Sequence, residues 1–131
     1  MWSDSPYCSA SSSADNYLSV VTETPIIGAE SANENLAAGQ MNWPHGFNLR
    51  YMTIEPGSAS KMHVRHEEEV IFVHCGELTV SLPGGSLDMI AGDTLTIPIG
   101  MERVFSNDGT NRVEAYVVRG GDSPRAATTV D

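Results

Sequence analysis

The sequence predicts an all-β domain, a small closed barrel preceded by an extended N-terminal arm. From Phe47 onward, short runs rich in β-branched and aromatic residues alternate with Gly and Pro at close, fairly even spacing, as in antiparallel sandwiches and barrels. Tight turns are expected at 83–85, 91–93 and 107–109. The predicted strands are 48–55, 61–66, 69–75, 77–82, 86–90, 93–97, 102–107 and 112–119. Eight strands suit a small closed barrel.

The chain divides into four segments. Residues 1–16 are rich in Ser, Ala and Asp and have too few apolar side chains to order themselves, so we expect a flexible segment. Residues 17–46 form an arm that packs on the barrel or on a dimer partner, with a short strand at 17–21. The barrel follows at 47–119, and a polar C-terminal tail at 120–131 completes the chain.

Length and charge exclude several classes of protein. The 131 residues suit one domain with a single site. The formal net charge is -10, and a surface that binds nucleic acid needs a surplus of basic residues. No apolar run approaches the roughly 18 residues of a membrane span. We therefore expect a soluble protein that binds neither nucleic acid nor a membrane.

The two cysteines indicate the compartment. The spacing of Cys8 and Cys75 resembles neither a zinc site nor a disulfide framework. The first residues also lack the positive region and the apolar stretch of an export signal. We expect both cysteines to be reduced thiols in a cytoplasmic protein.

A first group of residues has spacings that suit a binding site. It begins at Gly57, continues through His63, Arg65 and Glu69, and ends at Gly76. Alternate residues of a strand face the same side, so positions 63 and 65 are expected to project into the barrel together.

A second group lies about 35 residues further along the chain, at a separation that puts it on later strands of the predicted barrel. It begins at Gly92, continues through Pro98, Gly100 and Arg103, and ends at Asn107. Arg103 lies on a later strand, from which its side chain can close a ring with the residues of the first group.

Together the two groups resemble the two motifs of the cupin superfamily, over about residues 47–119. The resemblance implies a double-stranded β-helix, also called a jelly-roll barrel. In metal-bearing cupins, three histidines and a glutamate at these positions hold a divalent first-row metal. Relatives often pair as dimers, with N-terminal residues crossing to the neighbour, so we expect a homodimer.

This chain departs from the family pattern at two of the four liganding positions. His63 and Glu69 match, whereas Arg65 and Arg103 replace histidines. A guanidinium has no free lone pair and stays protonated, so it cannot ligate a cation. A metal site would need His63, Glu69 and a rescuing His66 swung inward at the turn.

Two arginines in a barrel favour an anion instead of a metal. Arg65 and Arg103, with Glu69 between them, could hold a carboxylate or phosphate in the fork geometry that guanidinium groups adopt. His63, with Glu69, would then be the candidate catalytic residue for proton transfer without a metal. The predicted walls of the ligand pocket are Ile71, Val73, Phe105 and, at the mouth, Tyr51.

Three functions remain open, and the sequence does not decide whether the protein is an enzyme. The first is a non-catalytic or ligand-sensing barrel, plugged by a buried ion-pair network. The second is a barrel that binds a small organic anion and carries out non-redox proton transfer. The third is a metal-dependent dioxygenase, isomerase or lyase using Fe, Mn, Ni or Zn. The substrate cannot be read from the sequence.

Overall fold

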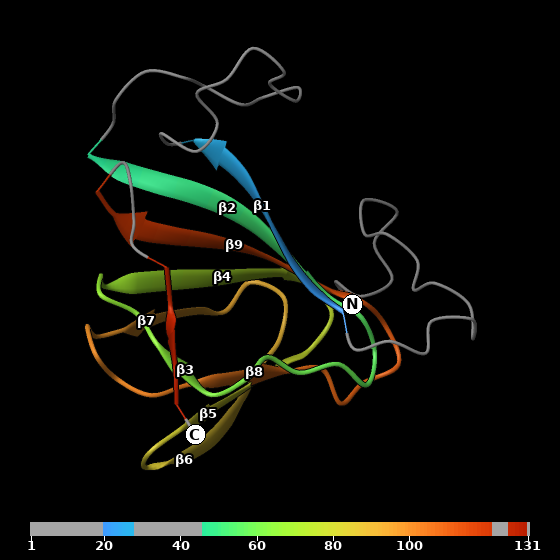
Figure 1. Ribbon diagram of the computed structural model, residues 1–131. Helices are drawn as coiled ribbons and strands as arrows, with labels where there is room; N and C mark the ends of the chain where they lie inside the picture. Colours follow the sequence, from blue (N-terminus) through green and yellow to red (C-terminus); the bar gives the residue numbers. More distant parts are fainter. Residues whose placement is uncertain (1–19, 28–45, 122–125, 131) are drawn as a thin grey trace.

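The computed structural model arranges residues 20–27, 46–121 and 126–130, the described part of the chain, into three antiparallel β-sheets (Figure 1). The predicted flexible segment 1–16 and much of the predicted arm lie outside these residues. The largest sheet has the order β1 (Val21–Ile27), β2 (Phe47–Ile54), β9 (Val113–Gly120), β4 (Glu69–Cys75) and β7 (Thr94–Ile97). The second sheet has the order β6 (Gly85–Met89), β5 (Leu78–Leu82) and β8 (Val104–Ser106). The third pairs β10 (Thr128–Thr129) with β3 (His63–Val64).

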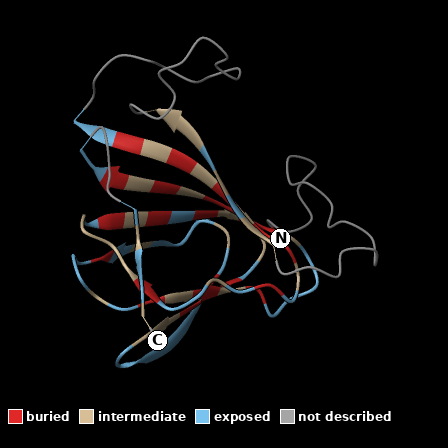
Figure 2. Ribbon diagram, in the orientation of Figure 1, coloured by how far each residue is buried: buried red, intermediate tan, exposed pale blue. Residues whose placement is uncertain are grey.

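The hydrophobic core lies between the two larger sheets, which face each other in Figure 1. Alternating apolar residues supply it, because side chains along a strand point to opposite faces. In β4, for example, the buried positions are Ile71, Val73 and Cys75, and the residues between them are less buried (Figure 2). The predicted all-β barrel is confirmed, and each of its eight predicted strands overlaps an observed strand.

One tight approach explains why the turn after β4 requires glycine. Gly76 has a φ of 82°, which side-chain-bearing residues rarely adopt. A Cβ atom there would lie 2.5 Å from the carbonyl oxygen of Arg112. Any larger residue would therefore push β4 away from the start of β9.

One local prediction about a strand is wrong. The N-terminal strand runs over Val21–Ile27, beyond the predicted end, and passes through Pro25. This is tolerated because β1 is an edge strand and its pairing with β2 is irregular after Pro25. The tail was expected to be polar and extended, and within it Thr128–Thr129 form the short strand β10.

The prediction that Cys75 is a reduced thiol is also wrong. Cys75 is 1% exposed and is disulfide-bonded in the structure. The sequence has one other cysteine, Cys8, which lies outside the described residues. No helix in the described part of the chain is long and apolar enough to cross a membrane.

Candidate functional site

Glu69 is the centre of a buried ion-pair network inside the barrel. It is the first residue of β4, its side chain faces inward, and it is fully buried. Its Oε1 accepts a hydrogen bond of 2.7 Å from Arg103, and its Oε2 accepts one of 2.6 Å from Arg119. Arg65 approaches the same carboxylate only to 3.9 Å. Both carboxylate oxygens therefore already accept short, charge-assisted hydrogen bonds.

Arg103 is fully buried, and every nitrogen of its guanidinium group donates a hydrogen bond. Besides the bond to Glu69, its Nε and Nη2 donate to the carbonyl of Met101 at 3.1 and 2.9 Å. Nη2 also approaches the carbonyl of Pro98 at 3.3 Å. Arg103 thus joins the loop before β8 to β4.

A second carboxylate, Glu23 on β1, extends the network. Arg119 Nη2 donates to both of its oxygens, at 3.1 and 2.8 Å. Arg65 lies 3.6 Å and Arg50 lies 3.9 Å from the same carboxylate. Counted over the described residues, the network therefore contains four guanidinium groups and two carboxylates.

The pKa values indicate that the carboxylate of Glu23 is ionised. Burial raises its pKa, but Arg119, Arg65 and Arg50 together lower it by more, and the net shift is downward. For Arg119, burial lowers the pKa, while attraction to Glu23 and Glu69 raises it overall. The six side chains together are therefore formally cationic.

Sequence reasoning missed Glu23, Arg50 and Arg119, because none belongs to either motif. Strand alternation could have indicated that the two arginines point into the barrel. Arg50 has the parity of the buried Met52 on β2, and Arg119 has that of the buried Val117 on β9. An arginine at an inward position of a buried strand is unusual unless it has an anionic partner.

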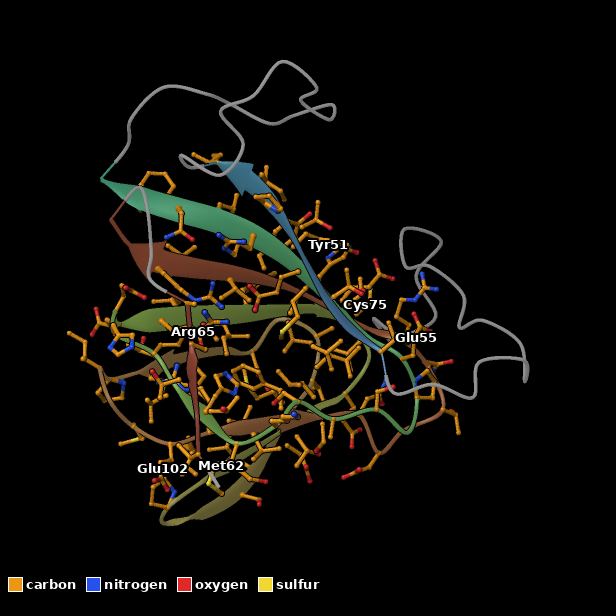
Figure 3. All side chains as sticks on the ribbon, viewed as in Figure 1. Tyr51, Glu55, Met62, Arg65, Cys75 and Glu102 are labelled. Carbon is orange, nitrogen blue, oxygen red and sulfur yellow. The ribbon has the colours of Figure 1, made fainter. Side chains whose placement is uncertain are left out.

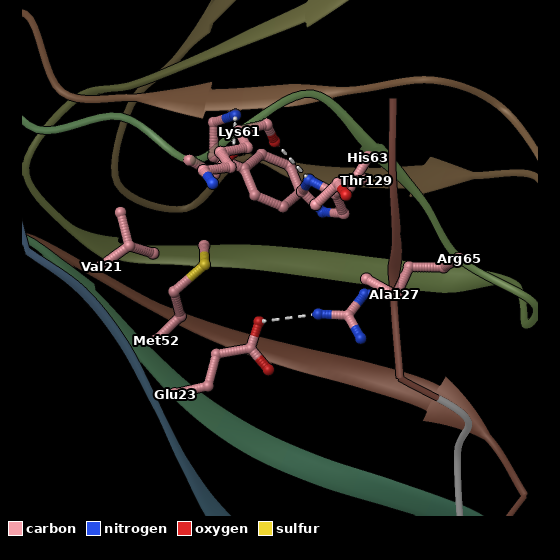
Figure 4. Close-up of a pocket in the computed structure, with 10 residues that line it drawn as sticks. Val21, Glu23, Met52, Lys61, His63, Arg65, Ala127 and Thr129 are labelled. Carbon is pink, nitrogen blue, oxygen red and sulfur yellow. Dashed lines mark hydrogen bonds and ion pairs between the residues drawn. The ribbon is translucent and has the colours of Figure 1, made fainter. Parts of the chain in front are cut away.

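A pocket of about 360 Å³ opens beside the network (Figure 4). Its polar lining residues are Glu23, Ser60, Lys61, His63 and Arg65. Its apolar lining residues are Val21, Met52 and Phe105. The lining is completed by Thr129 in β10 and by Ala127, which immediately precedes β10. The volume suits a small organic molecule.

Arg65 is the guanidinium group in this pocket, and its environment differs from that of Arg103. In the view of Figure 3, Arg65 lies where β10 passes the large sheet. Its ion pairs with Glu23 and Glu69 are long, at 3.6 and 3.9 Å. Its Nε is buried and has no hydrogen-bond partner among the described residues. Burial, followed by repulsion from Arg119, lowers its pKa.

His63 presents one ring nitrogen as a base. Its Nδ1 lies 2.7 Å from the carbonyl oxygen of Lys61, so Nδ1 carries the proton and donates it. The other nitrogen, Nε2, then has a free lone pair in the neutral ring. Burial is the largest cause of a lowered pKa, and repulsion from Arg65 and Arg103 acts in the same direction. The ring also packs edge-on against Phe105 at 5.6 Å.

The side chains here do not fit a metal ion. Glu69 has both oxygens bonded to arginines, and His66 Nε2 lies 3.1 Å from the Thr128 hydroxyl. Within residues 20–27, 46–121 and 126–130, no three His, Cys, Asp or Glu side chains form a group that could hold one. The donor set is cationic, which suits an anion.

The structure brings some predicted site residues together and separates others. His63, Arg65 and Phe105 line the pocket, whereas Glu69 and Arg103 belong to the network beside it. Ile71 and Val73 are fully buried in the core. Tyr51 lies on the opposite face of β2, where it hydrogen-bonds to Glu114 and its ring packs at 5.3 Å against Tyr116.

Comparison with solved structures supports the fold. A DMSP lyase, DddQ from Ruegeria pomeroyi DSS-3, matches with a TM-score of 0.69 and 18% identity, over 84% of this chain and 51% of the lyase. A cupin 2 domain-containing protein from Halorhodospira halophila matches with a TM-score of 0.69 and 17% identity, over 86% and 72%. This chain thus spans about half the length of the lyase. Identities this low show a common fold alone.

One further solved structure has a higher identity over a shorter stretch. A putative sugar phosphate isomerase from Acidithiobacillus ferrooxidans ATCC 23270 has 27% identity and a TM-score of 0.53, over 63% of this chain and 52% of that one.

Among curated proteins, no match was found. The family described as Cupin domain matches residues 50–119, which are 70 of the 131 residues. The chain therefore belongs to the cupin family.

Proposed function

We propose that this cupin barrel binds a small organic anion, a carboxylate or a phosphate, in the pocket beside the ion-pair network. The observation that carries the proposal is the state of Arg65. Its guanidinium lines the pocket, its ion pairs are long, and its Nε has no hydrogen-bond partner among the described residues. A carboxylate or phosphate oxygen would supply the missing acceptor.

The surroundings of Arg65 support the same ligand class. Lys61 adds a second cationic side chain to the pocket lining. Glu23 opposes an anion, but its charge is shared among Arg119, Arg65 and Arg50. The structurally similar putative sugar phosphate isomerase is named for a phosphate-bearing molecule, which agrees with an anionic ligand.

Thermal unfolding with a panel of small anions tests the binding proposal. Inorganic phosphate or succinate at millimolar concentration should raise the melting temperature, whereas sodium chloride of equal ionic strength and neutral glycerol should not. Arg65→Gln should abolish the rise. Arg112→Gln is the matched control, because Arg112 pairs with Glu55 at 2.7 Å away from the pocket lining. An equal rise in Arg65→Gln would contradict the proposal.

Proton transfer is a second candidate function, favoured by the geometry of His63. A neutral imidazole with Nε2 free, in a pocket that also holds a guanidinium, suits a general base acting on a bound anion. In heavy water, the protein should exchange carbon-bound hydrogens of an anion that it binds, and His63→Gln should bind without exchange. Binding without exchange in the unaltered protein would indicate a non-catalytic barrel.

Assembly and location stay predictions. A homodimer at micromolar concentration is expected, and light scattering checks it. The cytoplasmic location loses one of its supports, because Cys75 is disulfide-bonded and disulfides are rare in a reducing compartment. Fractionation of cells that produce the protein would decide the compartment.

A further inference from the structure

The strand β10 forms one wall of the pocket. Ala127 and Thr129 line the pocket, and they lie on the same face because side chains alternate along an extended chain. Thr128, between them, points the other way, and its hydroxyl lies 3.1 Å from His66 Nε2. Figure 4 shows Thr129 beside His63, its partner in the strand pairing. One face of β10 therefore belongs to the site.

Within the described part of the chain, only a few contacts hold this wall in place. Its strand pairing consists of Thr128 with Val64 and Thr129 with His63. One more backbone hydrogen bond, from Val130 N to the carbonyl of Met62, measures 2.8 Å. Both strand residues are exposed and none of residues 126–130 is buried, so detachment would expose little apolar surface. Segments of this kind open at a low free energy.

The neighbouring strand β3 does not depend on β10. On its other side, His63 exchanges two backbone hydrogen bonds with Arg103, of 3.1 and 3.0 Å. These bonds connect β3 to the barrel. Detachment of β10 would therefore leave His63 and Arg65 in position and uncover the pocket.

We propose that β10 is a detachable wall of the pocket, which opens to admit a ligand and closes over it. Residues 126–130 carry no charged side chain, so β10 does not compete with an anion for Arg65. Closure replaces water over the bound anion with neutral protein, which strengthens its attraction to the guanidinium. The anionic nature of the ligand rests on the proposed function, whereas the detachment of β10 does not.

Two substitutions of Val130 test the wall. Val130→Pro removes the N–H that donates to Met62, while Val130→Ala keeps this donor and also shortens the side chain. Diethyl pyrocarbonate reports access, because it modifies the neutral imidazole of His63 behind β10. His74 is an internal reference, because it lies on the outer face of β4 beside Tyr116. The modified peptides are quantified by mass spectrometry.

The expected result is faster modification of His63 in Val130→Pro, by about fivefold or more, with Val130→Ala within about twofold of the unaltered protein. His74 should react at the same rate in all three. A chain shortened to end at Gly121 should show the largest increase, and it serves if Val130→Pro does not fold. An unchanged rate at His63 in both the proline variant and the shortened chain would overturn the proposal.

Phosphate binding separates this proposal from the proposed function. If both hold, Val130→Pro should bind inorganic phosphate about three- to tenfold more weakly than Val130→Ala, through faster release. If the unaltered protein does not bind phosphate but access to His63 still responds to Val130→Pro, the wall is supported and phosphate is rejected. If phosphate binds equally to all variants and His63 access is constant, the wall is rejected and the anion site stands.

Discussion

Arg65 and Arg103 replace histidine in the two cupin motifs, yet they lie in different environments. The side chain of Arg103 is 0% exposed, and it donates to Glu69 and to backbone carbonyls. The side chain of Arg65 is 15% exposed and lines the pocket, and its ion pairs with the described residues are long. The same substitution has therefore produced a structural residue at one position and a candidate ligand contact at the other. The two roles differ in whether every guanidinium nitrogen has a hydrogen-bond acceptor among the described residues.

Removing the shared anion should have the largest effect. Glu69→Ala leaves Arg103 and Arg119 buried without their common carboxylate, and we expect a loss of about 4 kcal/mol in the free energy of unfolding. Urea denaturation measures it. Glu68→Ala is the matched control, because Glu68 is exposed and next in the sequence. A loss below about 1 kcal/mol would show that the network does not support the barrel.

Replacing each arginine in turn should separate their roles. Arg103→Met leaves the Met101 carbonyl and one Glu69 oxygen without donors, and should cost about 3 kcal/mol. Arg65→Met should cost about 1 kcal/mol or less, because its ion pairs are long. Denaturant unfolding of both variants checks the difference. Equal losses would mean that the two arginines have the same structural role.

The pH dependence of stability should report the pocket through His63. Burial lowers its pKa in the folded state. As the pH falls below about 6.5, the imidazole is therefore protonated in the unfolded chain before it is protonated in the folded protein. The stability from neutral His63 is complete above that pH and is lost as the pH falls. The slope is limited to about 1.4 kcal/mol per pH unit for one proton. His63→Gln should flatten the profile between pH 7 and 5.

Glu23 affects the stability of the fold in a separate pH range. Its folded-state pKa is lowered from 4.5, so its contribution is lost only as the pH falls below that value. If the slope of stability against pH above pH 5 is the same in His63→Gln as in the unaltered protein, the pH dependence does not come from His63.

The smallest effect is expected outside the barrel. Tyr51→Phe removes the hydrogen bond to Glu114 on the outer face of β2 and should cost about 1 kcal/mol or less. Phosphate affinity should not change, because Tyr51 does not line the pocket. Calorimetric titration checks this. Weaker phosphate binding in Tyr51→Phe would place the ligand on the other side of the sheet.

The sequence predicted the barrel better than the site. Strand alternation and glycine turns are local signals, and they located eight strands from β2 to β9, but they placed β1 too early in the chain. The short strand β10 gave no such signal, because Thr128 and Thr129 are polar and exposed. The roles of Arg65 and Arg103 depend on which donors are satisfied, and that depends on Glu23 and Arg119 from distant strands. Only the folded structure brings these residues together.

Nuclear magnetic resonance of the arginine Nε–H groups during a phosphate titration tests the central claim most directly. One spectrum reports both arginines, once each signal is assigned by substitution. The Arg65 Nε–H has no hydrogen-bond partner among the described residues, so its signal should shift and saturate as phosphate binds. The Arg103 Nε–H, which donates to Met101 at 3.1 Å, should stay in place. A stationary Arg65 signal with a shifting Arg103 signal would contradict the account.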